Sequence, residues 1–305
     1  MLWLIAALSS YLILAVIFLI DKYLLSAGLP NPKVYAFYVG ILGISVLLLT
    51  PFVNFYVPAF PQLMLCFFAG AFFLLGLIGF YKTLRISEAS RAVPAVGGMT
   101  PIFTLFLIYL FSKGKETLGF WDLISFSLLI LGTVLINYEG GKISRKSLGL
   151  AAFSAFLFSF SFVLTKYVYL SQGFWSGYIW IRISGAIAAI FLFLLSKEVK
   201  EEIFKKKDRL IAFSSRKSLV LFISNQLFGV TANILQNIAF FLVPLLYVAL
   251  INALQGIQYL FLFILTLIMS LIFPRIIKEK ISRKIIIQKS FATILICGGV
   301  AILAI

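Results

Sequence analysis

The stretch "FLIDKYLLSAG", residues 18–28, closes a long apolar run with a charged pair and an aromatic ring, and "FVLTKYVYLSQG", residues 162–173, repeats that pattern 144 positions later. At this offset Ser10 coincides with Ser154, Lys22 with Lys166 and Tyr23 with Tyr167. A second offset of 155 places "TPIFTLFLIYL", residues 100–110, over "QGIQYLFLFIL", residues 255–265. This ordered recurrence indicates that the chain is built from two related halves.

The composition points to a membrane protein. Of the 305 residues, 62% are hydrophobic and 12% are charged, and the mean hydropathy is +1.11. Soluble globular domains are only about 45–50% apolar. The apolar runs are continuous, whereas the strands of a membrane β-barrel would alternate over about ten residues. The sequence therefore predicts an all-α integral membrane protein.

A helix of about 20 apolar residues crosses the hydrocarbon layer of a bilayer, which allows the transmembrane segments to be counted. The ten predicted segments are 2–20, 34–50, 60–80, 92–111, 120–137, 147–165, 175–195, 218–240, 247–272 and 285–304. The connections are too short for an attached soluble domain. The first segment is expected to be retained, because its charges follow the apolar run and no small-residue cleavage site stands out.

The recurring sequence pattern and the segment count together predict two repeats of five helices, residues 1–143 and 144–305, in one integrated bundle. An odd number of spans per repeat places the halves in opposite orientations across the membrane. Inverted repeats of this kind are typical of secondary transporters, whose substrate site lies near the midplane between the halves. Lys22 and Lys166 are expected at equivalent helix ends, where a lysine reaches the interface or caps the last carbonyls.

The basic residues predict the orientation in the membrane. Taken alternately, the odd connections carry 21 Lys and Arg and the even ones carry 3. Because basic residues in short loops mark the cytoplasmic side, the odd connections are predicted to be cytoplasmic and both termini outside. The strongest contribution is residues 196–217, with 8 basic residues. We interpret this segment as a solvated loop against anionic lipid headgroups rather than a nucleic-acid site.

Three further stretches carry a family likeness. They are residues 83–136, with a short turn at 86–90, Pro101, Glu116 and Gly132; residues 162–187, with Lys166 and Arg182; and residues 279–303, led by Glu279. In these features the chain resembles the EamA-like ten-helix group of the drug/metabolite transporter superfamily. The resemblance implies a small-molecule transporter with cytoplasmic termini. On the orientation we follow the charge count of this chain, which places the termini outside the cell.

Arg182 is the most conspicuous candidate for a binding residue. It lies about seven residues inside the predicted segment that begins at 175. An ionised side chain within the membrane is costly and by default marks a functional site. Its guanidinium could hold a substrate carboxylate or phosphate. The alternative is a structural arginine that binds backbone carbonyls or reaches the nearer interface.

Amide side chains are concentrated on the eighth and ninth predicted segments. Those predicted to bind substrate are Asn233, Gln236, Asn237, Asn252, Gln255 and Gln258. Spacings of three and four residues place each set on one helical face, and amides supply both hydrogen-bond donors and acceptors. We expect them to line a central polar cavity. The alternative is that they hold neighbouring helices together.

Two further groups complete the predicted site. Trp180 could stack on a substrate, whereas the other aromatic residues near helix ends fit an interfacial belt better. In the fourth segment, the residues predicted to form a hinge are Pro94, Gly97, Gly98 and Pro101. Proline removes a backbone hydrogen bond and permits a kink, which suits a gate. The alternative is a static kink that serves close packing.

The scarcity of histidine, cysteine and acidic residues limits the functions that the chain could perform. The chain has no histidine, two cysteines and ten acidic residues, and all ten lie in connections or at segment ends. No metal, no cofactor and no enzymatic activity are therefore predicted. Proton-coupled carriers usually need a carboxylate or histidine inside the membrane. Facilitated diffusion or exchange is the expected transport mode.

The sequence thus predicts a multi-pass secondary transporter of the plasma membrane, which moves a small polar metabolite, anionic or zwitterionic, by alternating access. Its expected partners are that substrate and the membrane lipids, with no nucleic acid, and the chain is expected to act as a monomer or homodimer. One alternative is a flippase for a phosphate-bearing lipid-linked carrier. A membrane scaffold without transport is the other.

Overall fold

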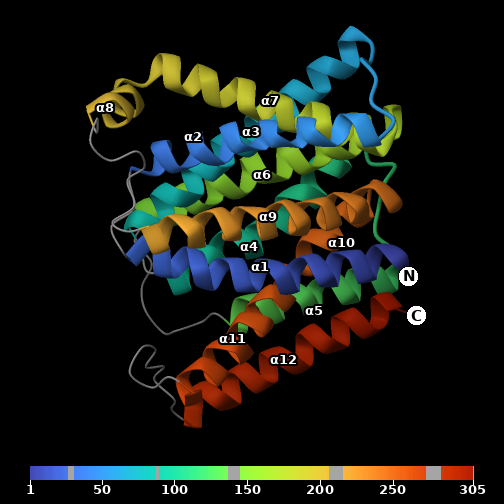
Figure 1. Cartoon of the computed structure of the whole chain (residues 1–305). Coiled ribbons are helices and arrows are strands. Elements are labelled where there is room, and N and C mark those ends of the chain that lie inside the picture. The colour runs from blue at the N-terminus through green and yellow to red at the C-terminus, as the bar shows by residue number, and fades with distance from the viewer. Residues whose placement is uncertain (27–30, 87–88, 137–144, 206–215, 273–282, 305) are drawn as a thin grey trace.

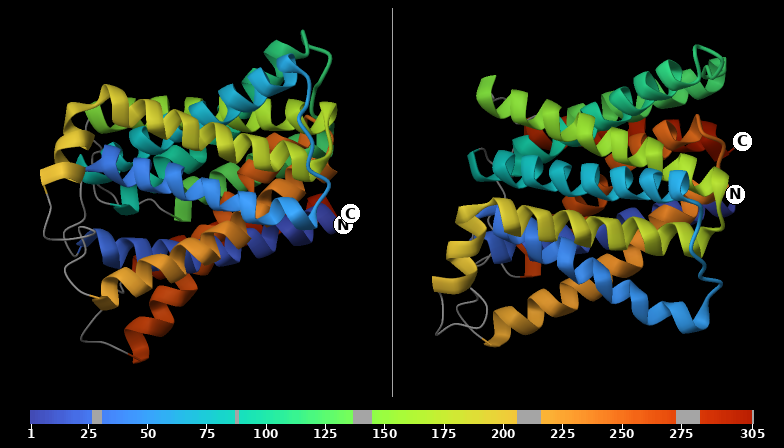
Figure 2. Two further views of the ribbon diagram at one scale, coloured as in Figure 1. Left: turned by 45° about the horizontal axis from the view of Figure 1, so that its top comes forward. Right: turned by 90° about the horizontal axis from the view of Figure 1, so that it is seen from above.

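The structure is a computed structural model, which describes residues 1–26, 31–86, 89–136, 145–205, 216–272 and 283–304. These residues form a bundle of helices and contain no β-strand. The helices run along a common direction in the views of Figure 1 and Figure 2, and the two chain ends lie at the same end of the bundle. The predicted all-α fold class is therefore confirmed.

The helices follow one another with short connections. Their bounds are α1 Leu2–Ser26, α2 Pro32–Leu42, the 3₁₀ helix η1 Gly43–Phe52, α3 Phe60–Ile86, α4 Ala89–Phe111, α5 Phe120–Ile136, α6 Arg145–Ser171, α7 Phe174–Leu195, α8 Lys197–Lys205, α9 Arg216–Leu242, α10 Tyr247–Ala253, α11 Gln255–Ile272 and α12 Arg283–Ala304. Each of the ten predicted apolar segments coincides with one of these helices or with a consecutive pair of them.

Two predicted segments are not uniform helices. Residues 34–50 pass from α2 into η1, which contains Pro51 near its end. The segment 247–272 is broken at Leu254, whose backbone N–H is shared between the carbonyls of Leu250 at 3.0 Å and Ile251 at 3.1 Å. This sharing marks a change from α-helical to 3₁₀ hydrogen bonding. It separates α10 from α11.

The sequence interpretation was wrong at two connections. Within 196–217, expected as a loop, residues 197–205 form α8, which docks through the fully buried Val199. After 165, where a helix end was expected, α6 continues to Ser171. Lys166 is consequently buried and donates from Nζ to the Phe241 carbonyl at 3.1 Å, near the end of α9. Its counterpart Lys22 lies in α1 and outside the side chains that the structure describes.

The helices have the length and apolar composition of a membrane protein. Among the described residues, the segments long and apolar enough to cross a membrane are Pro32–Phe52, Phe60–Thr83, Arg145–Ser171 and Phe174–Leu195. Shorter apolar helices occupy Leu2–Ile17, Ala95–Phe111, Phe120–Leu135, Tyr247–Leu262 and Ile287–Leu303. Large apolar side chains such as Phe120, at 72% exposure, and Ile294, at 66%, cover the outside of the bundle. Such a surface is stable in lipid and unstable in water.

Four helix pairs join the first half of the chain to the second. α1 lies along α9 and α6 lies along α3, while α5 pairs with α12 and α2 with α7. In the first pair the Ser10 hydroxyl donates to the Ala232 carbonyl at 2.8 Å. In the second pair the Ser154 hydroxyl donates to the Gly76 carbonyl at 2.7 Å. Both serines are fully buried, and they are the same two that coincide in the recurring sequence pattern.

Candidate functional site

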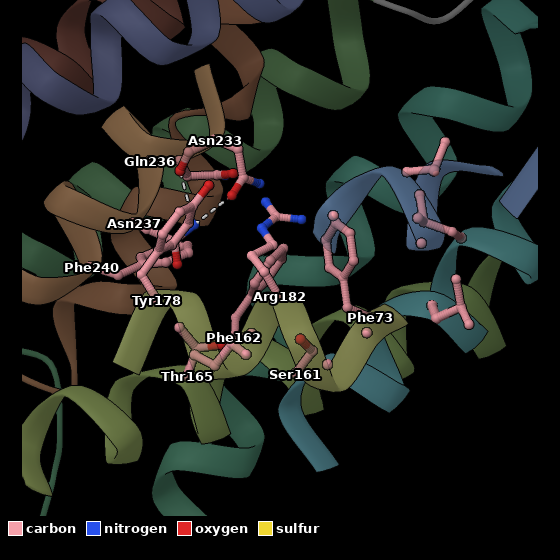
Figure 3. A pocket seen from close by; sticks show the side chains of 18 residues that line it. Phe73, Ser161, Phe162, Thr165, Tyr178, Arg182, Asn233, Gln236, Asn237 and Phe240 are labelled. Atoms are coloured by element: carbon pink, nitrogen blue, oxygen red, sulfur yellow. Dashed lines mark hydrogen bonds between the residues drawn. The ribbon is translucent and has the colours of Figure 1, made fainter. Parts of the chain in front are cut away.

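A pocket of about 600 Å³, including the space at its mouth, lies among α2, η1, α3, α6, α7 and α9. The side chains that line it are drawn in Figure 3. Its polar members include Arg182 from α7, Asn233, Gln236 and Asn237 from α9, and Ser161 and Thr165 from α6. The pocket thus joins helices from both halves of the chain.

Close contact between α3 and α7 shapes one wall of the pocket. A Cβ atom at Gly70 would lie 2.5 Å from the Gly185 backbone nitrogen and 2.6 Å from the Ile181 carbonyl oxygen. Only glycine therefore fits at this position in α3. The approach of the two backbones sets the register of the helices, which brings Phe73 of α3 opposite Arg182 of α7.

Arg182 presents its guanidinium to the pocket between two aromatic rings (Figure 3). The guanidinium carbon lies 5.7 Å from the ring centroid of Phe73 and 5.4 Å from that of Tyr178. Ring faces attract a cation at this distance. In the part of the chain that the structure describes, no hydrogen bond or ion pair engages the guanidinium. Its hydrogen-bond donors are therefore available.

The amides of α9 are held in a defined orientation. The Asn237 side-chain nitrogen donates to the backbone carbonyl and to Oδ1 of Asn233, both at 2.9 Å. The Tyr169 hydroxyl donates to Asn237 Oδ1 at 2.8 Å. Because a backbone carbonyl can only accept a hydrogen bond, the Asn237 atom that faces it is the amide nitrogen. The Asn233 atom that faces this nitrogen is then the amide oxygen, Oδ1. The Asn233 amide nitrogen is then left to face the guanidinium of Arg182, as Figure 3 shows.

Gln236 occupies the side of the pocket nearest α1. It forms a side-chain hydrogen bond with the hydroxyl of Tyr11, and that hydroxyl donates to the Ile251 carbonyl at 2.7 Å. Tyr11 is buried at 2% exposure. These contacts connect the pocket to α1 and α10.

The described lining of the pocket carries positive charge and no negative charge. Among the described residues that line it there is no Asp or Glu, and Arg182 is the one charged residue. Apolar side chains form the rest of the wall; they include Val39, Phe73, Leu74, Leu77, Phe162 and Phe240. An apolar enclosure strengthens the attraction of the uncompensated cation for an anion, because little water screens it.

Half of the predicted binding residues lie together and half lie elsewhere. Arg182, Asn233, Gln236 and Asn237 line the pocket. Trp180 does not: its ring nitrogen donates to the Tyr56 carbonyl at 2.9 Å and its ring stacks on Phe55. Trp180 thus fastens the segment between η1 and α3 onto α7.

The amides of α10 and α11 also lie outside the pocket lining. The buried Asn252 donates to the Thr104 hydroxyl of α4 at 3.1 Å. Gln255 lies beside Gly97 of α4, and Gln258 is buried at 7% exposure. The two amide sets therefore do not line the same pocket in this structure: Asn252 and Gln255 meet α4, whereas the amides of α9 face Arg182.

The predicted hinge residues lie in a helix that is not broken. α4 is continuous from Ala89 to Phe111 across all four of them; the side chain of Pro94 is outside those described. At Gly97 a Cβ would collide with the Tyr259 hydroxyl, and at Gly98 it would contact Val134 at 3.5 Å. Gly97 therefore serves close packing in this conformation, whereas a side chain at Gly98 would make only an ordinary contact. Whether α4 bends during a functional cycle stays a prediction.

Sequence reasoning missed several members of the site. Tyr178 precedes Arg182 by four residues and so shares its helical face, a signal that the sequence does contain. Phe73 and Tyr169 carry no such signal, because they reach the site through contacts between distant helices. The pairing of α3 with α7 depends on Gly70, one of 21 glycines in the chain.

Comparisons with known proteins support the fold. No protein-family model matches the chain, and no curated protein matches it either. Solved structures do match. One, described only as "Crystal structure of protein", has 13% sequence identity and a TM-score of 0.70, over 98% of this chain and 97% of that chain. Agreement over nearly the whole of both chains indicates the same fold, and at this identity it indicates the fold alone.

Proposed function

We propose that this protein is a membrane transporter of the EamA-like kind, which moves a small anionic metabolite across the plasma membrane by alternating access. One observation carries the proposal: the guanidinium of Arg182 projects into a pocket between helices and has no carboxylate partner there. An unpaired cation within a membrane protein is costly. A substrate anion that enters the pocket would offset this cost.

The packing of the helices supports the transporter architecture. The contact of α1 with α9 has its counterpart in the contact of α6 with α3, and each is fastened by a buried serine at the equivalent position. Two inverted five-helix repeats would produce this correspondence. In such proteins the substrate site lies between the halves, where the Arg182 pocket also lies.

The orientation follows from charge. We propose ten membrane crossings, with both termini outside and the basic connections in the cytoplasm. α8 begins directly after α7, at the end of the bundle opposite the termini (Figure 1). Its Lys197 and Lys200 would then meet the anionic cytoplasmic leaflet.

A thermal-shift screen of purified protein in detergent tests the proposal. The panel contains small carboxylates, organic phosphates, amino acids, sugars and quaternary amines. An anion at 100 times its Kd should stabilise the folded state by about 2.7 kcal/mol. Arg182→Gln should lose this stabilisation, whereas Arg145→Gln, a change at an exposed arginine that begins α6, should keep it. Equal stabilisation of both variants by the same anion would contradict the proposal.

A further inference from the structure

We propose that the pocket selects a monocarboxylate with an apolar body about the size of a phenyl ring, and that it discriminates against phosphates and against compounds that carry an ammonium group. This inference rests on the proposed function and narrows the substrate class of the same site. It is carried by the balance of charge, donors and apolar surface around Arg182.

The charge of the pocket matches one negative charge. Arg182 contributes a single positive charge, and the other lining residues that the structure describes are uncharged. The nearest candidate for a second cation, Lys166, is not a lining residue and already donates to the Phe241 carbonyl. A phosphate dianion would therefore enter with one charge uncompensated, which is unfavourable in an apolar enclosure.

The donors converge on a point that suits a carboxylate. The Phe73 and Tyr178 rings hold the guanidinium at 5.7 and 5.4 Å from their centroids. The Asn233 amide nitrogen faces the same guanidinium (Figure 3). Neither the guanidinium nor the amide nitrogen can accept a hydrogen bond from the other, so an acceptor bound between them would satisfy both. A carboxylate can accept two hydrogen bonds from arginine and one from the amide.

The pocket provides few acceptors for an ammonium group. Asn233 Oδ1 accepts from Asn237, and Asn237 Oδ1 accepts from Tyr169. The Ser161 hydroxyl donates to the Ala69 carbonyl, and the other acceptors of the lining, the side-chain oxygens of Gln236 and Thr165, are neutral. No carboxylate is among the described lining residues, so the ammonium group of an amino acid would lie beside the arginine charge without an anionic partner. A site that leaves a buried polar group unpaired rejects it strongly.

The remaining wall suits an apolar body. Beyond Arg182 the pocket is bounded by Phe162 and Phe240 and by the aliphatic Val39, Leu74 and Leu77. A bare acetate ion would leave this wall exposed to water, so a ring-sized body should add affinity.

The test uses four compounds with the same phenyl body: 3-phenylpropanoate, phenylalanine, 2-phenylethylamine and phenyl phosphate. Calorimetry on the full-length protein in detergent measures each Kd. The carboxylate should bind at least ~10-fold more tightly than the other three, since a single unmatched polar group in such a site costs this much or more. Acetate should bind more weakly than 3-phenylpropanoate.

Variants show which side chains are responsible. Arg182→Gln should weaken 3-phenylpropanoate binding at least ~30-fold, as loss of a buried charge partner does, and Asn233→Leu about 10-fold, as loss of one charge-assisted hydrogen bond does. Thr231→Val, an exposed change on the same helix, is the control and should leave the Kd unchanged. Thermal unfolding without ligand confirms that each variant is folded.

The outcomes separate this inference from the proposed function. Equal or tighter binding of phenylalanine or phenyl phosphate overturns the monocarboxylate selectivity, and so does the absence of binding by all four compounds. In either case the transporter proposal survives if other anions exchange across proteoliposomes in a manner that depends on Arg182. If no anion exchanges at all, the proposed function fails together with the inference.

Discussion

Arg182 presents its guanidinium to the pocket between two ring faces, which leave its hydrogen-bond donors unpaired. Cation–ring contacts contribute about 0.5–2 kcal/mol each, so they hold the side chain in place without neutralising it. A carboxylate partner within the protein would have held the arginine more firmly but would have competed with an anionic substrate. The site is thus arranged for an external anion.

Arg182→Lys distinguishes geometry from charge at this position. Lysine keeps the positive charge but loses the planar, bidentate donor pattern and the stacking. We expect anion binding about 10-fold weaker than in the wild type and stronger than in Arg182→Gln, since about 1.4 kcal/mol corresponds to each factor of ten. Calorimetric titration with the best anion of the thermal-shift screen measures this order. An equal Kd of the anion for Arg182→Lys and the wild type would show that bidentate recognition plays no part.

The residues of the site differ in how far the sequence predicts them. Arg182 is predictable because a charge in a long apolar run is conspicuous. Asn233 and Asn237 are predictable as neighbours because four residues make about one helical turn. The side chains of Asn252 and Phe73 could not be placed, since each depends on which distant helix it meets. Those pairings are set by packing at glycines, whose role emerges only in three dimensions.

At the scale of helices, the α3–α7 contact at Gly70 determines the wall that holds Arg182. Gly70→Ala places a Cβ against backbone atoms of α7, which cannot move aside as a side chain could. We expect a loss of about 1–3 kcal/mol in unfolding free energy, as overpacking costs in other cores. Gly149→Ala in α6, where a Cβ would meet nothing within 4 Å, is the control and should not destabilise. Unfolding in detergent measures both; equal stability of the two variants would contradict the close contact.

A charged link joins α8 to the beginning of α2. Glu198 accepts from the Lys33 ammonium and from the Asn31 amide, both at 3.0 Å. The hydrogen bond from Lys33, then that from Asn31, holds the pKa of Glu198 below its ordinary value of 4.5. Because the folded-state pKa is lowered, the link stabilises this contact above the ordinary value and is lost as pH falls through the lowered one.

This link predicts a pH-dependent contact of α8. Hydrogen exchange of the α8 amides should be slow at neutral pH and faster in acid below the lowered pKa of Glu198. Glu198→Gln removes the titrating group, so its α8 should exchange at the faster rate already at neutral pH and change little with acid. Protection that is the same in both proteins at every pH would exclude a role for the ion pair.

The helix positions were predictable where the membrane alone decides them. Continuous apolar runs set the ten segments, because a bilayer imposes their length. The breaks and additions were not predictable: α8 depends on docking of Val199, and the turn at Leu254 on shared backbone hydrogen bonds. Lys166 was expected at a helix end and is instead buried against α9, because α6 continues past the predicted end at 165 to Ser171.

At the scale of the whole molecule, the proposed repeat can be tested at Ser10 of α1 and Ser154 of α6, the serines that coincide at the sequence offset of 144. Ser10→Ala and Ser154→Ala each remove a buried hydrogen bond to a facing helix. Each should cost about 0.5–1.5 kcal/mol, and the double variant should lose the sum because the two sites share no partner. Unfolding free energies in detergent check this. Strongly unequal costs would argue that the two contacts are not equivalent.

The central claim is that an anion crosses the membrane through the pocket of Arg182. The most direct measurement is counterflow in proteoliposomes preloaded with the anion that stabilises the protein best, with wild type, Arg182→Gln and Arg145→Gln reconstituted at equal density. If the anion binds at Arg182 during transport, wild type and Arg145→Gln should take up labelled anion rapidly. Arg182→Gln should take it up at a rate near that of empty liposomes. Uptake by Arg182→Gln at the wild-type rate would contradict it.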